Sequence, residues 1–136
     1  MKVNELTIGS WVLGKYDNEP YQIKGISKTE DYIVAKVFEH GMWQKVDVFE
    51  PIPLTPEILK KNGFEFDDVI PECRMFMGID DRVALRNDKE YMNSVNEWHV
   101  HIDSEDYCTI ANCELTYVHE LQNLLRLCKI NKEILV

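Results

Sequence analysis

Residues 51–64 read PIPLTPEILKKNGF and form the strongest local folding signal in the chain. Thr55 is a natural N-cap, because its hydroxyl can accept a backbone N–H of the first turn, and Pro56 suits the first helical position. Gly63 can take the left-handed conformation that ends a helix. The stretch therefore predicts a two-turn helix over 56–62, which would link an N-terminal part of the chain to a C-terminal part.

The chain before this helix, residues 1–54, has the pattern of short strands joined by tight turns. Apolar and polar residues alternate within it, and Gly, Asp, Asn and Pro residues separate the alternating runs. The expected strands lie within 6–14, 21–26, 31–39 and 43–50. Four or five short strands in so little chain favour a small SH3-like antiparallel β-barrel or a curled meander.

The remaining chain, residues 55–136, is expected to pack antiparallel strands against one C-terminal amphipathic helix. Residues 64–81 are acidic and irregular, and 87–97 look like a long loop. We expect strands over 82–87 and 97–103, one long strand or two short ones over 107–117, and a helix over 117–128. On that helix Val118, Leu121, Leu125 and Cys128 recur at helical spacing. The predicted fold class is α+β, with two subdomains or one shared core, and Ile134 and its apolar neighbours docked onto it.

Composition limits the classes of function. The chain has 136 residues, 45% of them hydrophobic, and a formal net charge of −9, so we expect a folded cytoplasmic protein with no membrane partner. Residues 64–136 carry 15 acids and 7 bases. Each uncompensated acid opposes contact with phosphates, so this half disfavours a nucleic-acid partner.

Catalytic signatures are missing from the sequence. The four cysteines contain no C-x-x-C pair, and there is no G-x-G, G-K-[ST] or G-x-S-x-G motif. HELQN at 119–123 half-matches the zinc-protease H-E-x-x-H, but Asn123 stands where the second metal-binding His belongs. A Cys–His pair assembled in space is left open. We therefore expect no enzyme, no catalytic residue and no cofactor.

Three groups of side chains are candidates for ligand binding. The strand that contains Trp98 has a polar face, formed by Glu97, His99, His101 and Asp103. Such a face could hold a divalent metal, but we favour a solvated edge strand. The last helix carries a polar face of His119, Gln122, Asn123 and Arg126. This face either binds an anionic or amide-rich ligand or is an ordinary solvent-exposed helix face. Arg82 and Arg86 share a strand face and would hold phosphates or pair with acids, while Trp98 and Tyr117 would stack on a base or pack in the core.

Three segments also carry a family resemblance: IGSWV at 8–12, EPIPLTPEILKKNGF at 50–64 and YVHELQNLLRLC at 117–128. They resemble a family of small proteins encoded by phages, prophages and mobile elements of Bacteroides-type gut bacteria. These motifs mark the family but carry no known chemistry, so no catalytic residue is transferred. The resemblance implies a cytoplasmic accessory protein that binds and neutralises a host component, including the nucleotide signals of antiviral defence.

These observations lead to one hypothesis and two alternatives. The leading hypothesis is a non-enzymatic, homo-oligomeric protein that sequesters a nucleotide-like immune signalling molecule of the host. Its ligand would be held by Arg82, Arg86, Trp98, His99, His101, Tyr117, His119, Gln122, Asn123 and Arg126. The alternatives are an acidic inhibitor of a host protein and a small nucleic-acid-associated SH3-like module. We assign no metal site.

Overall fold

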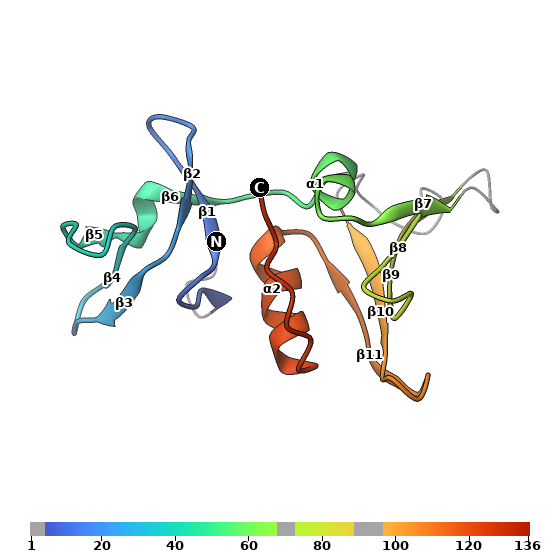
Figure 1. Cartoon of the computed structure of the whole chain (residues 1–136). Coiled ribbons are helices and arrows are strands. Elements are labelled where there is room, and N and C mark those ends of the chain that lie inside the picture. The colour runs from blue at the N-terminus through green and yellow to red at the C-terminus, as the bar shows by residue number, and fades with distance from the viewer. Residues whose placement is uncertain (1–4, 68–72, 89–96) are drawn as a thin grey trace. The chain divides into compact units, whose positions relative to one another are not determined.

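The computed structural model describes residues 5–67, 73–88 and 97–136, and these form mostly antiparallel sheets with two α-helices (Figure 1). The expected α+β class is thus confirmed. Contacts divide the chain into an N-terminal unit, Met1–Ile52 with Tyr117–Asn123, and a C-terminal unit, Pro53–Thr116 with Leu124–Val136. The expected boundary at 54/55 lies close to the first division, but the return of 117–123 to the N-terminal unit has no counterpart in the prediction.

The N-terminal unit holds two three-stranded antiparallel sheets. One has the order β2-β1-β6, from β1 (Trp11–Gly14), β2 (Pro20–Gln22) and β6 (Phe49–Pro51). The other has the order β3-β4-β5, from β3 (Gly25–Lys28), β4 (Ile33–Lys36) and β5 (Gln44–Lys45). Their shared core consists of Leu6, Val12, Ile23, Ala35, Val37, Val46 and Phe49. In the described part of this unit the two sheets do not close into a barrel.

Two expected strands of this unit are each broken in the structure, for the same reason. The strand expected over 21–26 becomes β2 and β3, and the one expected over 43–50 becomes β5 and β6, with a 3-10 turn, η2 (Val46–Val48), between them. In both cases the chain leaves one sheet and enters the other. A change of sheet requires a bend, which period-two alternation does not reveal.

The helix expected over 56–62 is confirmed as α1 (Pro56–Lys61), with both predicted caps. The Thr55 hydroxyl accepts a backbone N–H of the first turn at 3.4 Å. Gly63 has φ of +80°, and the backbone N–H of Phe64 donates to the Leu59 carbonyl at 3.1 Å. This is the Schellman arrangement that the sequence predicts.

A five-stranded antiparallel sheet of order β11-β10-β9-β8-β7 dominates the C-terminal unit. Its strands are β7 (Glu65–Asp67), β8 (Cys73–Gly78), β9 (Val83–Asp88), β10 (Trp98–Asp103) and β11 (Thr109–Leu115). The strands predicted over 82–87 and 97–103 are confirmed, and 107–117 contains one strand. The prediction of an irregular segment over 64–81 is wrong, because β7 and β8 pair within these residues. Most of the expected loop over 87–97, residues 89–96, lies outside the described residues.

The predicted C-terminal helix is α2 (Val118–Leu127), and its apolar side is as expected except for Cys128, which follows the helix and is half-buried. Val118, Leu121 and Leu125 are completely buried, and Ile134 is 1% exposed after the helix ends. The first part of α2 belongs to the N-terminal unit and the last part to the C-terminal unit. The helix is therefore divided between the two units.

Candidate functional sites

The start of α2 is fastened to the N-terminal unit by two amide side chains of the predicted polar stripe. Gln122 accepts the backbone N–H of Trp11 and donates to the Gly9 carbonyl, both at 3.1 Å. Asn123 donates to the backbone carbonyl of Glu5 at 2.6 Å. Both amides therefore satisfy backbone groups, and Gln122 is 5% exposed. Their role is to position the helix, which leaves little for a ligand.

His119, from the same stripe, lies completely buried between these contacts. Among the described residues neither ring nitrogen has a hydrogen-bond partner, and a carboxylate oxygen of Glu5 lies 3.9 Å from Nε2. The Tyr117 ring stacks on the imidazole at a centroid distance of 5.8 Å and an interplanar angle of 9°. Burial lowers the pKa of His119, against the opposing effect of Glu120 and Glu5. At neutral pH the ring is therefore neutral and keeps a lone pair.

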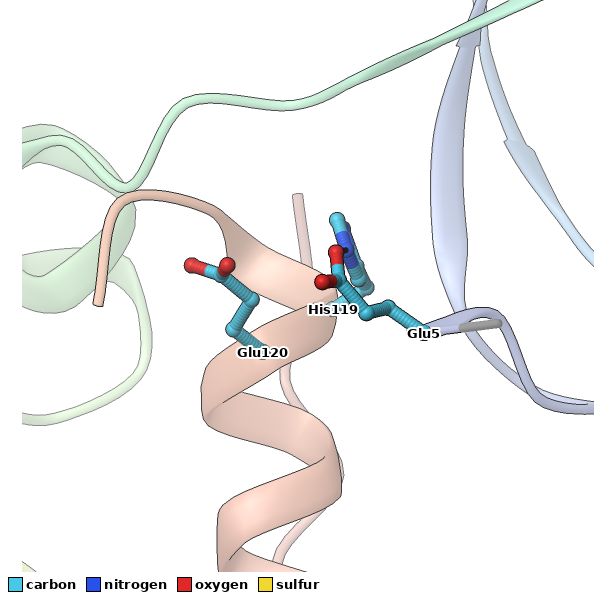
Figure 2. A group of neighbouring side chains, drawn as sticks. All are labelled: Glu5, His119 and Glu120. Carbon is cyan, nitrogen blue, oxygen red and sulfur yellow. Dashed lines mark ion pairs between the residues drawn. The ribbon is translucent and has the colours of Figure 1, made fainter. Parts of the chain in front are cut away.

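Two carboxylates stand beside this imidazole. Figure 2 shows the Glu5 carboxylate next to the His119 ring, with Glu120 following on the first turn of α2. One ligand atom from each residue lies within 4.8 Å of the other two. The Glu120 carboxylate accepts the backbone N–H of Tyr117 at 2.9 Å, as the acid of a capping box does. We name Glu5, His119 and Glu120 the His119 cluster.

Tyr117 also lines a pocket of about 570 Å³ in the N-terminal unit. The pocket walls are Lys15, Val46, Asp47, Phe49, Glu50, Pro51 and Tyr117. Val46 and Phe49 are buried and supply an apolar floor, whereas the charged residues are exposed. The Lys15 ammonium donates to the Asp47 backbone carbonyl at 3.3 Å. The pocket thus combines one cation, two carboxylates and an aromatic ring.

In the C-terminal unit, three other predicted residues share one face of the sheet. His99 on β10 is paired with Arg86 on β9 and with Glu114 on β11. His101, two residues along, contacts Asp103 at 2.9 Å between Nε2 and Oδ1. Because paired residues of antiparallel strands point to the same side, Arg86 and both histidines lie on the half-exposed face. The predicted alternation of β10 is confirmed.

The remaining three predicted residues, Trp98, Arg82 and Arg126, also belong to the C-terminal unit. Trp98 is 1% exposed, donates from Nε1 to the Leu54 carbonyl at 2.6 Å, and packs edge-on against Phe76. It has no open ring face on which a base could stack. The Arg82 carbonyl accepts the backbone N–H of Asp103 in the turn before β9, and Arg126 is exposed near the end of α2.

The structure therefore does not establish one site that contains all ten predicted residues. Tyr117, His119, Gln122 and Asn123 belong to the N-terminal unit, and Arg82, Arg86, Trp98, His99, His101 and Arg126 to the C-terminal unit. Sequence reasoning missed Glu5, Glu120 and the pocket residue Lys15. The only available signal was the sequence HELQN, in which Glu120 directly follows His119. This pair is not evidence for a protease, but it does place an acid next to the histidine in the sequence.

No family model, no curated protein and no solved structure matches this chain. Among the described residues, no helix has the length and apolar character needed to cross a membrane.

Proposed function

We propose that this protein is a non-enzymatic binding protein that sequesters a small nucleotide-like ligand in the pocket beside Tyr117. The supporting observation is the combination of groups in one cavity: an aromatic ring, a lysine and two carboxylates around an apolar floor. A volume of about 570 Å³ falls in the range of small-molecule sites.

Each group has a chemical counterpart in a nucleotide. The Tyr117 ring would stack on the base, because every base offers a π-face. The Lys15 ammonium would pair with a phosphate as a point charge. Asp47 and Glu50 would accept hydrogen bonds from ribose hydroxyls, as acidic residues do in dinucleotide sites. Two acids against one lysine favour a ligand with few phosphates and exposed sugar hydroxyls.

The cellular setting of this proposal comes from the sequence. The resemblance to phage-encoded accessory proteins supports action in the host cytoplasm, where sequestration would lower the free concentration of an immune signal.

The architecture of the N-terminal unit is the second part of the proposal. An SH3-like fold is supported by the pairing of its last strand, β6, with its first, β1. A homo-oligomer is supported by three exposed apolar residues between β4 and β5, Phe38, Met42 and Trp43. Light scattering after size exclusion would measure that oligomer.

Calorimetry tests the binding function directly. Purified protein is titrated with cyclic dinucleotides and with ADP-ribose derivatives, and we expect saturable heat from at least one of them. Tyr117→Ala should weaken that ligand at least tenfold, or about 1.4 kcal/mol, whereas Tyr117→Phe should retain it. Lys15→Gln should also weaken it, and Lys132→Gln, on an exposed residue outside the pocket, should not. No heat from any compound at micromolar protein would end the proposal.

A second candidate, an acidic inhibitor of a host protein, is favoured by one end of the sheet in the C-terminal unit. The turns after β8 and β10 are neighbours, because Val83 pairs with Ile102 beside them. They expose four carboxylates: Asp80, Asp81, Glu105 and Asp106. If this end covers a basic surface, changing the four to Asn or Gln should release a partner captured from host lysate, and high salt should do the same.

A further inference from the structure

The His119 cluster contains a buried imidazole that makes no hydrogen bond to any described residue. His119 is 0% exposed, and within residues 5–67, 73–88 and 97–136 neither ring nitrogen finds a hydrogen-bond partner. Burying such a group costs about 1–3 kcal/mol in proteins, so native structures nearly always give it a partner. One ligand atom of the Glu5 carboxylate and one of the Glu120 carboxylate lie within 4.8 Å of a ring nitrogen. An imidazole nitrogen within 4.8 Å of two carboxylate oxygens is the donor set of a metal site.

We propose that Glu5, His119 and Glu120 bind one divalent transition-metal cation of the Zn²⁺ class. The imidazole nitrogen and one oxygen from each carboxylate supply three ligands, and water completes the shell. A nitrogen ligand favours zinc and its transition-metal neighbours over Mg²⁺ or Ca²⁺, which prefer oxygen alone. The site is distinct from the nucleotide pocket, although Tyr117 lies beside both.

The geometry requires only a small adjustment. Ligand atoms about 2.0–2.1 Å from a tetrahedral zinc lie about 3.3 Å from one another. The His119 Nε2 and Glu5 Oε2 atoms are 3.9 Å apart, and all three donors lie within 4.8 Å. The Glu5 side chain is 39% exposed, so it can rotate by this amount and gives a cation access from solvent.

The surroundings of the cluster already orient its ligands. The Tyr117 ring stacks on the imidazole, and the Tyr117 backbone N–H holds the Glu120 carboxylate at 2.9 Å. Outer contacts of this kind fix the direction of metal ligands and raise affinity. The positive end of the α2 dipole, equivalent to about half a charge, opposes a cation, but two carboxylates outweigh it. Before a cation binds, the net charge of the two carboxylates and the helix end is therefore negative.

Zinc titration after chelator treatment tests the proposal. Wild-type protein is stripped with EDTA, dialysed and titrated with ZnCl₂ by calorimetry, and its melting temperature is followed against zinc concentration. We expect one equivalent per chain and a melting temperature that rises with zinc, because the cation binds only the folded form. Co²⁺ in place of zinc should give a visible absorption band from the bound ion.

Variants decide which residues hold the metal. Glu5→Gln should weaken zinc at least tenfold, and His119→Leu should abolish the zinc-dependent rise. In EDTA, His119→Leu should be at least as stable as wild type, because it removes an unpartnered polar ring. His101→Gln is the matched control, since His101 pairs with Asp103 in the C-terminal unit. The proposal is overturned if wild type binds no zinc, or if zinc binding survives either Glu5→Gln or His119→Leu unchanged.

Discussion

Replacing Trp98 with phenylalanine should destabilise the C-terminal unit strongly. The indole is 1% exposed and donates to the Leu54 carbonyl at 2.6 Å. Phenylalanine lacks this donor, and loss of a partner from a buried carbonyl costs about 1–3 kcal/mol. The smaller ring also leaves about 40 Å³ unfilled, which adds about 1 kcal/mol at roughly 24 cal/mol per Å³. We expect the free energy of unfolding to fall by about 2–4 kcal/mol in total.

Urea denaturation followed by far-UV circular dichroism measures this loss. With a slope of about 2 kcal/mol per M, the midpoint should move down by about 1–2 M. Tyr107→Phe is the control, because Tyr107 lies in the same unit and is 73% exposed, so its substitution should cost less than about 0.5 kcal/mol. A Trp98→Phe protein as stable as the Tyr107→Phe control would refute the reasoning, since neither the bond nor the burial would then stabilise the unit.

Three further substitutions separate other physical effects. A Cβ on Gly78 would lie 2.6 Å from the Phe64 ring, so Gly78→Ala should cost about 1–3 kcal/mol by overpacking, as thermal denaturation would show. A Cβ on Gly63 meets nothing within 4 Å, so Gly63→Ala should cost only about 1–2 kcal/mol, from its φ of +80°. In a Phe64→Leu background the Gly78→Ala cost should shrink and the Gly63→Ala cost should not; equal behaviour would contradict the steric account. The Tyr21 hydroxyl donates to the Asp17 carboxylate at 2.6 Å and holds the pKa of that group below its ordinary 3.8. A lowered pKa stabilises the fold above the unfolded value and loses that effect as pH falls through the folded one. Tyr21→Phe should therefore raise the Asp17 pKa toward 3.8 in an NMR titration, and an unchanged pKa would assign the shift to other groups.

Local signals in the sequence predicted the elements that depend on local chemistry. The caps of α1 at Thr55 and Gly63 need only neighbouring residues, and the alternation of β10 needs only one buried face. The breaks within 21–26 and 43–50 depend on which sheet each segment joins, and that choice is made by the whole N-terminal core. Strand β7 escaped prediction because its residues are mostly acidic and it is held by backbone pairing with β8.

The candidate sites were harder to predict than the fold because their residues are distant in the sequence. Glu5 stands at the beginning of the chain and His119 near its end, so nothing in their spacing indicates a cluster. Tyr117 was proposed as a ligand contact, but its pocket neighbours are Lys15, just after β1, and residues of η2 and β6, and these could not be assigned. For Trp98 the sequence left two readings, stacking on a base or packing in the core, and its 1% exposure agrees with the second.

The division of α2 between two units has a consequence for the order of events during translation. The N-terminal unit needs Tyr117–Asn123, and these residues leave the ribosome long after Met1–Ile52 have been made. The two N-terminal sheets therefore cannot complete their packing until α2 has been synthesised. Until then the Trp11 N–H and the Gly9 carbonyl lack their hydrogen bonds to Gln122. A nascent chain stalled before residue 117 should remain sensitive to protease across its first half.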